Sequence, residues 1–84
     1  MRVKTFTKWK AKTITSLAEL CLKRATDDNV VQALRTLMRK VRYAKRRDLP
    51  GLIFLFHTAA EETGVKELLK LVPSEEEIDN ITAG

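Results

Sequence analysis

The sequence predicts one small all-α domain, a bundle of four or five helices that spans residues 1–84. Three observations lead to this fold class. Apolar residues recur at helical spacing over residues 30–44, Ser-x-x-Glu capping boxes stand where two helices would begin, and Gly64 lies where another would end. Folding a chain of 84 residues buries only roughly 60–65% of its unfolded surface, so a deep enzyme-like cleft is not expected.

The first expected helix is amphipathic and ends near Ala25. One of its faces carries five small or apolar residues: Ile14, Leu17, Ala18, Cys21 and Ala25. Ser16 and Glu19 match a capping box, so this helix can begin as late as Ser16, with Thr13 as a competing cap. Residues 1–12 mix apolar and basic side chains and fit no single structure.

The second helix is the most regular element in the sequence. The run Asp27, Asp28, Asn29 can accept the free amides at a helix start, and the periodic pattern then extends to about Arg46. Its apolar stripe has spacings of four, three, four and three: Val30, Leu34, Leu37, Val41 and Ala44. The turn at residues 48–51 ends the helix and places Pro50 where the next helix can start.

A third helix is expected over Leu52–Thr63, with Gly64 as its left-handed cap. Its first five residues are all apolar and would also suit a buried strand, but the length of the whole run favours a helix. We expect this hydrophobic helix at the centre of the bundle.

Two shorter helices complete the expected bundle. One spans Lys66–Leu71 and stops before Pro73. The other opens with the capping box of Ser74 and Glu77 and would dock through Ile78 and Ile81.

The two halves of the chain have opposite charge. Residues 1–47 hold 14 basic and three acidic side chains, whereas residues 48–84 hold two basic and eight acidic ones. Such polarity suits a face that binds a polyanion, and it also lets basic and acidic surfaces pair within or between chains. No transmembrane segment or secretory signal is seen, and the lone Cys21 fits a reducing compartment, so we expect an intracellular protein, cytoplasmic or nuclear.

A strip of arginines on the second helix is the main candidate site. Arg35, Arg39, Arg42 and Arg46 follow one another at spacings of four, three and four, opposite the apolar stripe, and three more basic residues flank them: Lys40, Lys45 and Arg47. Arginine suits bidentate contact with phosphate, so the strip predicts nucleic-acid binding. Two other interpretations stay open, namely a solvated or internally neutralised face and an acidic protein partner.

The basic segment around Trp9 is a second candidate contact. Lys8, Trp9, Lys10 and Lys12 interleave an aromatic ring with ammonium groups, which can stack on a base and hold phosphates. The alternative is that Trp9 packs across the end of the core together with Phe6.

No catalytic centre, metal site or cofactor site is predicted. His57 is the single histidine, and Glu61 one turn later could accept a hydrogen bond from it, but neither belongs to a nucleophile, metal or phosphate-loop pattern.

Cys21 is expected to be mostly buried. Phe54 falls on the polar side of the third helix, so it is expected either in the core or at a homodimer interface.

The first residues allow another fold for the N-terminal half. Val3, Thr5 and Thr7 alternate with Arg2 and Lys4 ahead of two helices, an order that resembles ribbon–helix–helix operator binders. The resemblance covers about half of the chain and implies a strand at its start.

The leading hypothesis is a non-enzymatic accessory protein that binds DNA or RNA through arginine–phosphate contacts. The alternative is an adaptor or self-assembling protein whose basic strip docks an acidic protein or another copy of the chain. Binding to a membrane surface ranks third, because the apolar stripe of the second helix is needed for the core.

Overall fold

The computed structural model describes the backbone of residues 3–83 and the side chains of residues 5–82. In this part of the chain there are four α-helices and two 3₁₀ helices and no strands, so the predicted all-α bundle is confirmed. The elements follow in the order α1 Val3–Lys23, α2 Asp28–Tyr43, η1 Arg46–Asp48, α3 Leu49–Thr63, η2 Lys66–Leu71 and α4 Glu75–Ala83.

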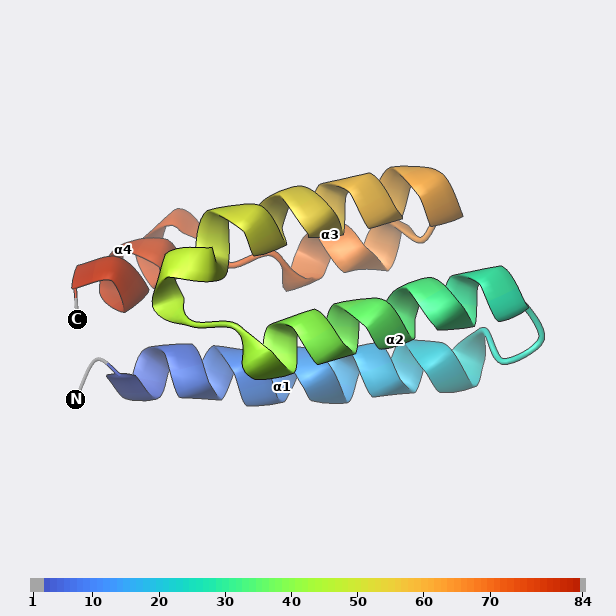
Figure 1. The fold of residues 1–84 in the computed structure, drawn as a ribbon, viewed down its shortest axis with the longest axis horizontal. Coiled ribbons are helices and arrows are strands. Elements are labelled where there is room, and N and C mark those ends of the chain that lie inside the picture. The colour runs from blue at the N-terminus through green and yellow to red at the C-terminus, as the bar shows by residue number, and fades with distance from the viewer. Residues whose placement is uncertain (1–2, 84) are drawn as a thin grey trace.

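The helices run back and forth along an elongated body of 40 × 20 × 18 Å (Figure 1). α1 and α2 form one antiparallel pair, α3 lies beside α2, and η2 returns behind α3. α4 then packs against α1 and closes the bundle. The described chain therefore begins and ends at the same end of the molecule.

α1 begins at Val3, ten or more residues before the predicted starts, so neither Thr13 nor Ser16 caps it. The N-terminal strand implied by the ribbon–helix–helix resemblance is also wrong, because residues 3–12 are helical. The cause is one buried face with spacings of three, four, four and three: Phe6, Trp9, Thr13, Leu17 and Leu20. Thr13, only 2% exposed, is a core residue.

α2 starts as predicted but ends at Tyr43, about three residues early. The carboxylate of Asp27 accepts a hydrogen bond from the Val30 amide at 3.2 Å, and the stripe from Val30 to Ala44 is buried. Ala44 is extended, and its carbonyl oxygen accepts a hydrogen bond from Nζ of Lys10 at 2.9 Å. The Lys45 amide then donates to Asp48 Oδ2 at 2.8 Å, which fixes the turn into η1.

α3 ends where the sequence predicts, since Gly64 adopts φ 73° and its amide donates to the Ala60 carbonyl oxygen. The prediction that this helix is central is wrong. Only one of its faces is in the core, through Leu49, Leu52, Phe56 and Ala60, whereas Phe54 is 69% exposed. Phe54 is therefore not a core residue.

Trp9 joins three segments of the core. Its indole stacks on Phe6 at a centroid distance of 6.1 Å, meets the edge of Phe56 at 6.4 Å, and donates a hydrogen bond from Nε1 to the Leu71 carbonyl oxygen at 3.1 Å. These contacts tie α1 to α3 and η2.

The C-terminal segment follows its sequence signals. The Ser74 amide donates to Glu77 Oε1 and the Glu77 amide donates to Ser74 Oγ, both at 3.1 Å, which confirms the capping box before α4. Ile81 is fully buried and Ile78 half-buried. Across residues 3–83, no helix combines the length and the apolar character needed to cross a membrane.

Candidate nucleic-acid interface

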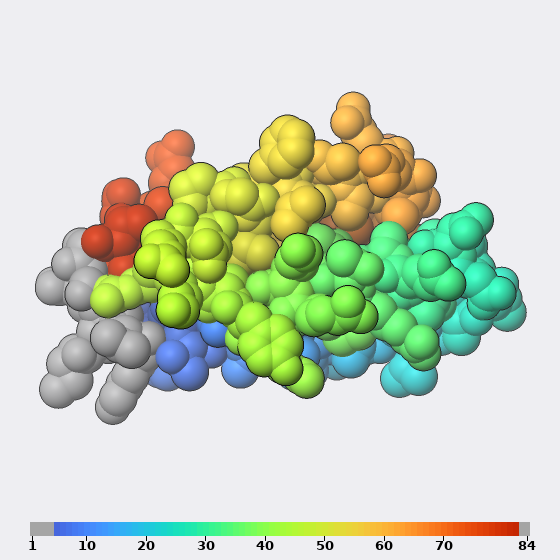
Figure 2. Space-filling model, viewed as in Figure 1, coloured from blue at the N-terminus to red at the C-terminus, as the bar shows by residue number. Residues whose placement is uncertain are grey.

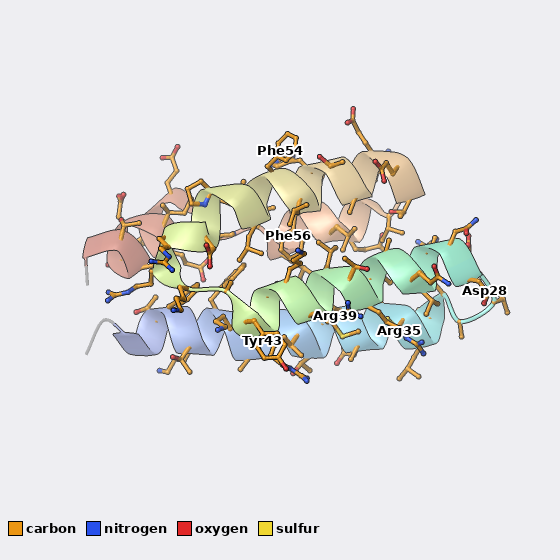
Figure 3. The ribbon with its side chains drawn as sticks, in the orientation of Figure 1. Asp28, Arg35, Arg39, Tyr43, Phe54 and Phe56 are labelled. Carbon is orange, nitrogen blue, oxygen red and sulfur yellow. The ribbon has the colours of Figure 1, made fainter. Side chains whose placement is uncertain are left out.

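The exposed face of α2 carries three arginines in one row, which we call the arginine ridge: Arg35, Arg39 and Arg42. The row exists because the opposite side of the same helix holds the buried stripe, so residues between the apolar positions face outward. Arg35 and Arg39 follow one another along the helix toward Tyr43 (Figure 3). The ridge therefore concentrates three guanidinium groups within about two helical turns.

Arg46 does not extend the ridge, so the continuous strip of four arginines is wrong. The chain leaves the α-helix at Ala44, which places Arg46 and Arg47 in η1. Arg46 is half-buried, whereas Arg47 and Lys45 are exposed. The Lys10 and Asp48 hydrogen bonds that end α2 are the physical reason for the break.

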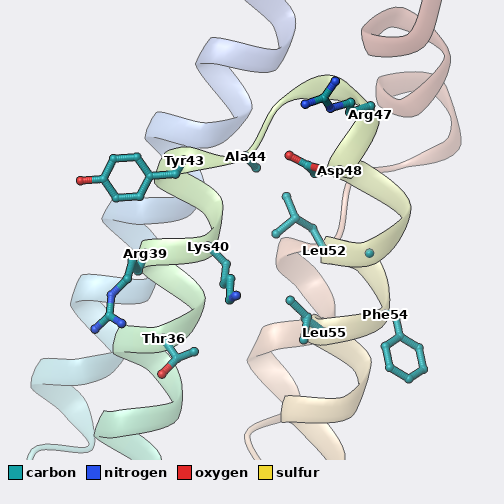
Figure 4. Close-up of a pocket in the computed structure, with 11 residues that line it drawn as sticks. Thr36, Arg39, Lys40, Tyr43, Ala44, Arg47, Asp48, Leu52, Phe54 and Leu55 are labelled. Carbon is teal, nitrogen blue, oxygen red and sulfur yellow. The ribbon is translucent and has the colours of Figure 1, made fainter.

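A groove of about 780 Å³ separates α2 from α3. The face shared by the two helices, green and yellow in Figure 2, is hollowed along this line. Three cations line the groove, Arg39, Lys40 and Arg47, with the single carboxylate of Asp48. The rings of Tyr43 and Phe54 stand on its outer rims, one on each helix (Figure 4).

A smaller hollow of about 320 Å³ lies on the ridge itself. Its lining consists of the three ridge arginines together with Met38 and Tyr43, all from α2. Met38 is half-buried and packs against the core, so it supplies an apolar floor. Tyr43 is 74% exposed and borders both the hollow and the groove.

The ridge has no acidic partner within the described side chains. Over residues 5–82 the one ion pair joins Arg24, the residue after α1, to Glu67 in η2 at 3.5 Å. The pKa of Glu67 is lowered first by a hydrogen bond from its own backbone amide and then by Arg24. Internal neutralisation of the ridge, one of the alternatives above, is therefore not found among these residues.

The segment around Trp9 offers fewer exposed side chains for nucleic-acid contact than the sequence predicts. Trp9 is only 4% exposed and its ring packs on Phe6 and Phe56, so the predicted stacking on a nucleic-acid base is wrong and the alternative of packing in the core is confirmed. Lys10 donates to Ala44 and lies 5.2 Å from the centroid of the Phe6 ring, which makes it a structural residue. Lys8 and Lys12 are exposed on α1, and neither lines the groove.

His57 and Glu61 are exposed on α3 at the rim of another surface hollow. Cys21 is partly buried and packs against the core. Among the residues that the structure describes, no group of three or more His, Cys, Asp or Glu side chains could hold a metal ion.

Tyr43 borders this candidate surface and was not predicted from the sequence. It follows Arg39 by four positions and Arg35 by eight, so its spacing alone places it on the ridge. An aromatic residue near the end of an amphipathic helix more often packs in a core, which hides this signal.

No family model matches the sequence, and comparisons with curated proteins and with solved structures find no similar protein.

Proposed function

We propose that this protein is a non-enzymatic nucleic-acid-binding protein whose arginine ridge contacts phosphates. The observation that carries the proposal is the ridge itself, three exposed guanidinium groups with no carboxylate partner in the described part of the chain. Like charges at these spacings disfavour a helix by about 0.2–0.5 kcal/mol per pair. An anionic partner removes this cost, and the planar guanidinium fits phosphate oxygens in pairs.

The surroundings of the ridge strengthen the electrostatic argument. Lys40 and Arg47 line the adjoining groove, and Lys45 is exposed in the turn after α2, so the positive charge continues from the ridge to the end of α2 and into this turn. Acidic residues are concentrated instead toward the end of α3 and in α4. Because the end of α4 lies beside Arg46 and Arg47, a polyanion approaches the arginine ridge on α2 in preference to η1.

The first prediction concerns Arg39→Gln, which removes the central charge of the ridge. Each phosphate contact displaces condensed counterions, so log affinity falls linearly with log salt. The variant is expected to bind all sequences more weakly and to flatten this slope by about one unit. Fluorescence anisotropy at several salt concentrations measures both effects.

Lys66→Gln is the matched control, because Lys66 is an exposed cation in η2, away from the ridge. It removes the same charge and should leave the slope unchanged. If the wild type binds neither DNA nor RNA at low salt, or if both variants behave alike, phosphate binding by the ridge is overturned and an acidic protein becomes the better partner.

Phe54 supports a second candidate function, self-association. It is 69% exposed, and Leu55 beside it is 36% exposed, so α3 presents an apolar patch to solvent. We propose that this patch buries itself against a second copy of the chain, which a small domain with a limited core would favour.

The second prediction tests this patch with Phe54→Glu. Because the ring is exposed, the charged side chain stays in water and circular dichroism should be unchanged, in contrast to a core position. Light scattering should show the apparent mass fall by half. A folded variant with an unchanged mass would exclude self-association through Phe54.

A further inference from the structure

Tyr43 has no structural role that explains its position. Within the side chains described, its ring makes no aromatic contact and its hydroxyl makes no hydrogen bond, and 74% of the residue is exposed. Figure 4 shows the ring standing out from α2 on the side away from α3, the same side to which Arg39 points. An exposed aromatic ring among guanidinium groups is the arrangement found where proteins hold unpaired bases.

The hollow on the ridge has the parts that a nucleotide needs. Tyr43 supplies a flat apolar surface, Met38 an apolar floor, and the ridge arginines surround both with positive charge. Arg39 and Tyr43 are four residues apart, a rise of about 6 Å along the helix. One nucleotide can therefore place its base on the Tyr43 ring and its phosphate on the Arg39 guanidinium.

A duplex cannot use this arrangement. In double-stranded DNA or RNA each base face is covered by its neighbours, so a surface ring meets only the sugar–phosphate backbone and gains little. A single strand can turn a base outward and stack it on the phenol ring. The cations contribute to either form of nucleic acid, whereas Tyr43 contributes to only one of them.

We infer that the partner of this chain is single-stranded nucleic acid, with an unpaired base stacked on Tyr43 over the ridge hollow and the flanking phosphates held by Arg39 and Arg42. This inference rests on the proposed function and adds the class of substrate. An anionic membrane is a poorer occupant, since the apolar stripe of α2 is buried and Tyr43 alone offers little area for insertion.

The test is a set of anisotropy titrations with a short labelled oligothymidylate and with a hairpin duplex. The proteins are the wild type, Tyr43→Ala, Tyr43→Phe and Leu69→Ala, each checked by circular dichroism. Leu69 is the control because it is 44% exposed and lies in η2, where it lines neither the ridge hollow nor the groove.

The wild type should bind the oligothymidylate more tightly than the duplex at the same salt. Tyr43→Ala should weaken binding to the single strand by about tenfold without changing the salt slope, because a stacked ring is lost and no charge is. Tyr43→Phe keeps the ring and should bind as the wild type does. The single-strand affinity of Leu69→Ala and the duplex affinities of all variants should be unchanged.

The titrations separate the inference of single-strand binding through Tyr43 from the proposed phosphate binding by the ridge. Equal affinity for both probes, or unchanged single-strand affinity in Tyr43→Ala, would overturn the inference while leaving phosphate binding in place. No binding to either probe would overturn the proposed function as well. In that case, binding to phosphatidylserine–phosphatidylcholine vesicles would assign the ridge to a membrane surface, and binding to polyglutamate would assign it to an acidic protein.

Discussion

The triple variant Arg35→Gln, Arg39→Gln, Arg42→Gln is expected to lose nucleic-acid affinity by about a hundredfold at ~0.1 M salt. Each guanidinium that meets a phosphate releases roughly 0.7 counterions from a single strand and roughly 0.9 from a duplex. Removing three contacts therefore flattens the dependence of log affinity on log salt by about two to three units. The protein should be as stable as the wild type or slightly more so, because like charges are removed from an exposed helix face.

The matched control removes the same net charge from elsewhere. Lys23, Lys66 and Lys70 are exposed at the end of α1 and along η2, and their replacement by Gln leaves the ridge intact. If this control loses as much affinity as the ridge variant, overall charge governs binding and the ridge has no special part. Titrations of both variants against one oligonucleotide over a range of salt decide between the two.

Phe56→Ala is expected to destabilise the fold by about 3–5 kcal/mol, the largest effect on stability anticipated for this chain. Phe56 is fully buried, and the indole of Trp9 meets its ring edge-on. Truncation removes apolar contacts from both partners and leaves a cavity where α1 meets α3. Since small domains have only about 5–15 kcal/mol in total, much of the variant should be unfolded.

Phe54→Ala makes the same chemical change two residues earlier on the same helix. Because Phe54 is 69% exposed, its truncation should alter the free energy of unfolding by no more than about 0.5 kcal/mol. Urea unfolding followed by circular dichroism compares the two variants at low protein concentration, where self-association is minimal. Similar losses in both would contradict the assignment of one α3 face to the core and the other to solvent.

The parts of the fold that the sequence predicts well are those set by local chemistry. The αL cap at Gly64, the Ser74–Glu77 box and the Asp27 cap before α2 each depend on residues within one turn of one another. The end of α2 could not be predicted in this way. It depends on the hydrogen bond from Lys10 to Ala44, which joins residues 34 positions apart.

The start of α1 was missed for a different reason. Thr13 lies in the middle of the buried face, and a polar residue there divides the apolar pattern into two pieces that look unrelated. Thr13 and Ser16 also resemble helix caps, since both residue types compete for backbone amides. Only the packing of Phe6 and Trp9 against the rest of the bundle shows that the helix is continuous.

Helical spacing predicts the part of the candidate site that lies within α2 and fails beyond the end of that helix. Arg35, Arg39 and Arg42 share a face because they lie within α2, whereas Arg46 leaves that face when the helix ends. The sequence left Trp9 open between stacking on a base and packing in the core; the structure buries Trp9 and exposes Tyr43 instead. Which of two aromatic residues is in the core depends on tertiary contacts that a periodic pattern does not contain.

The single tryptophan, Trp9, lies where the N-terminal helix α1 contacts η2 near the C-terminal end of the chain. Its bond to Leu71 joins residues 62 positions apart, whereas α1, α2 and α3 each pack on the next helix in the sequence. Closing a longer loop costs more chain entropy, so this junction is expected to form after the local hairpins in folding. The protein thus contains its own optical probe, since indole emission follows closure of the bundle and circular dichroism follows the helices.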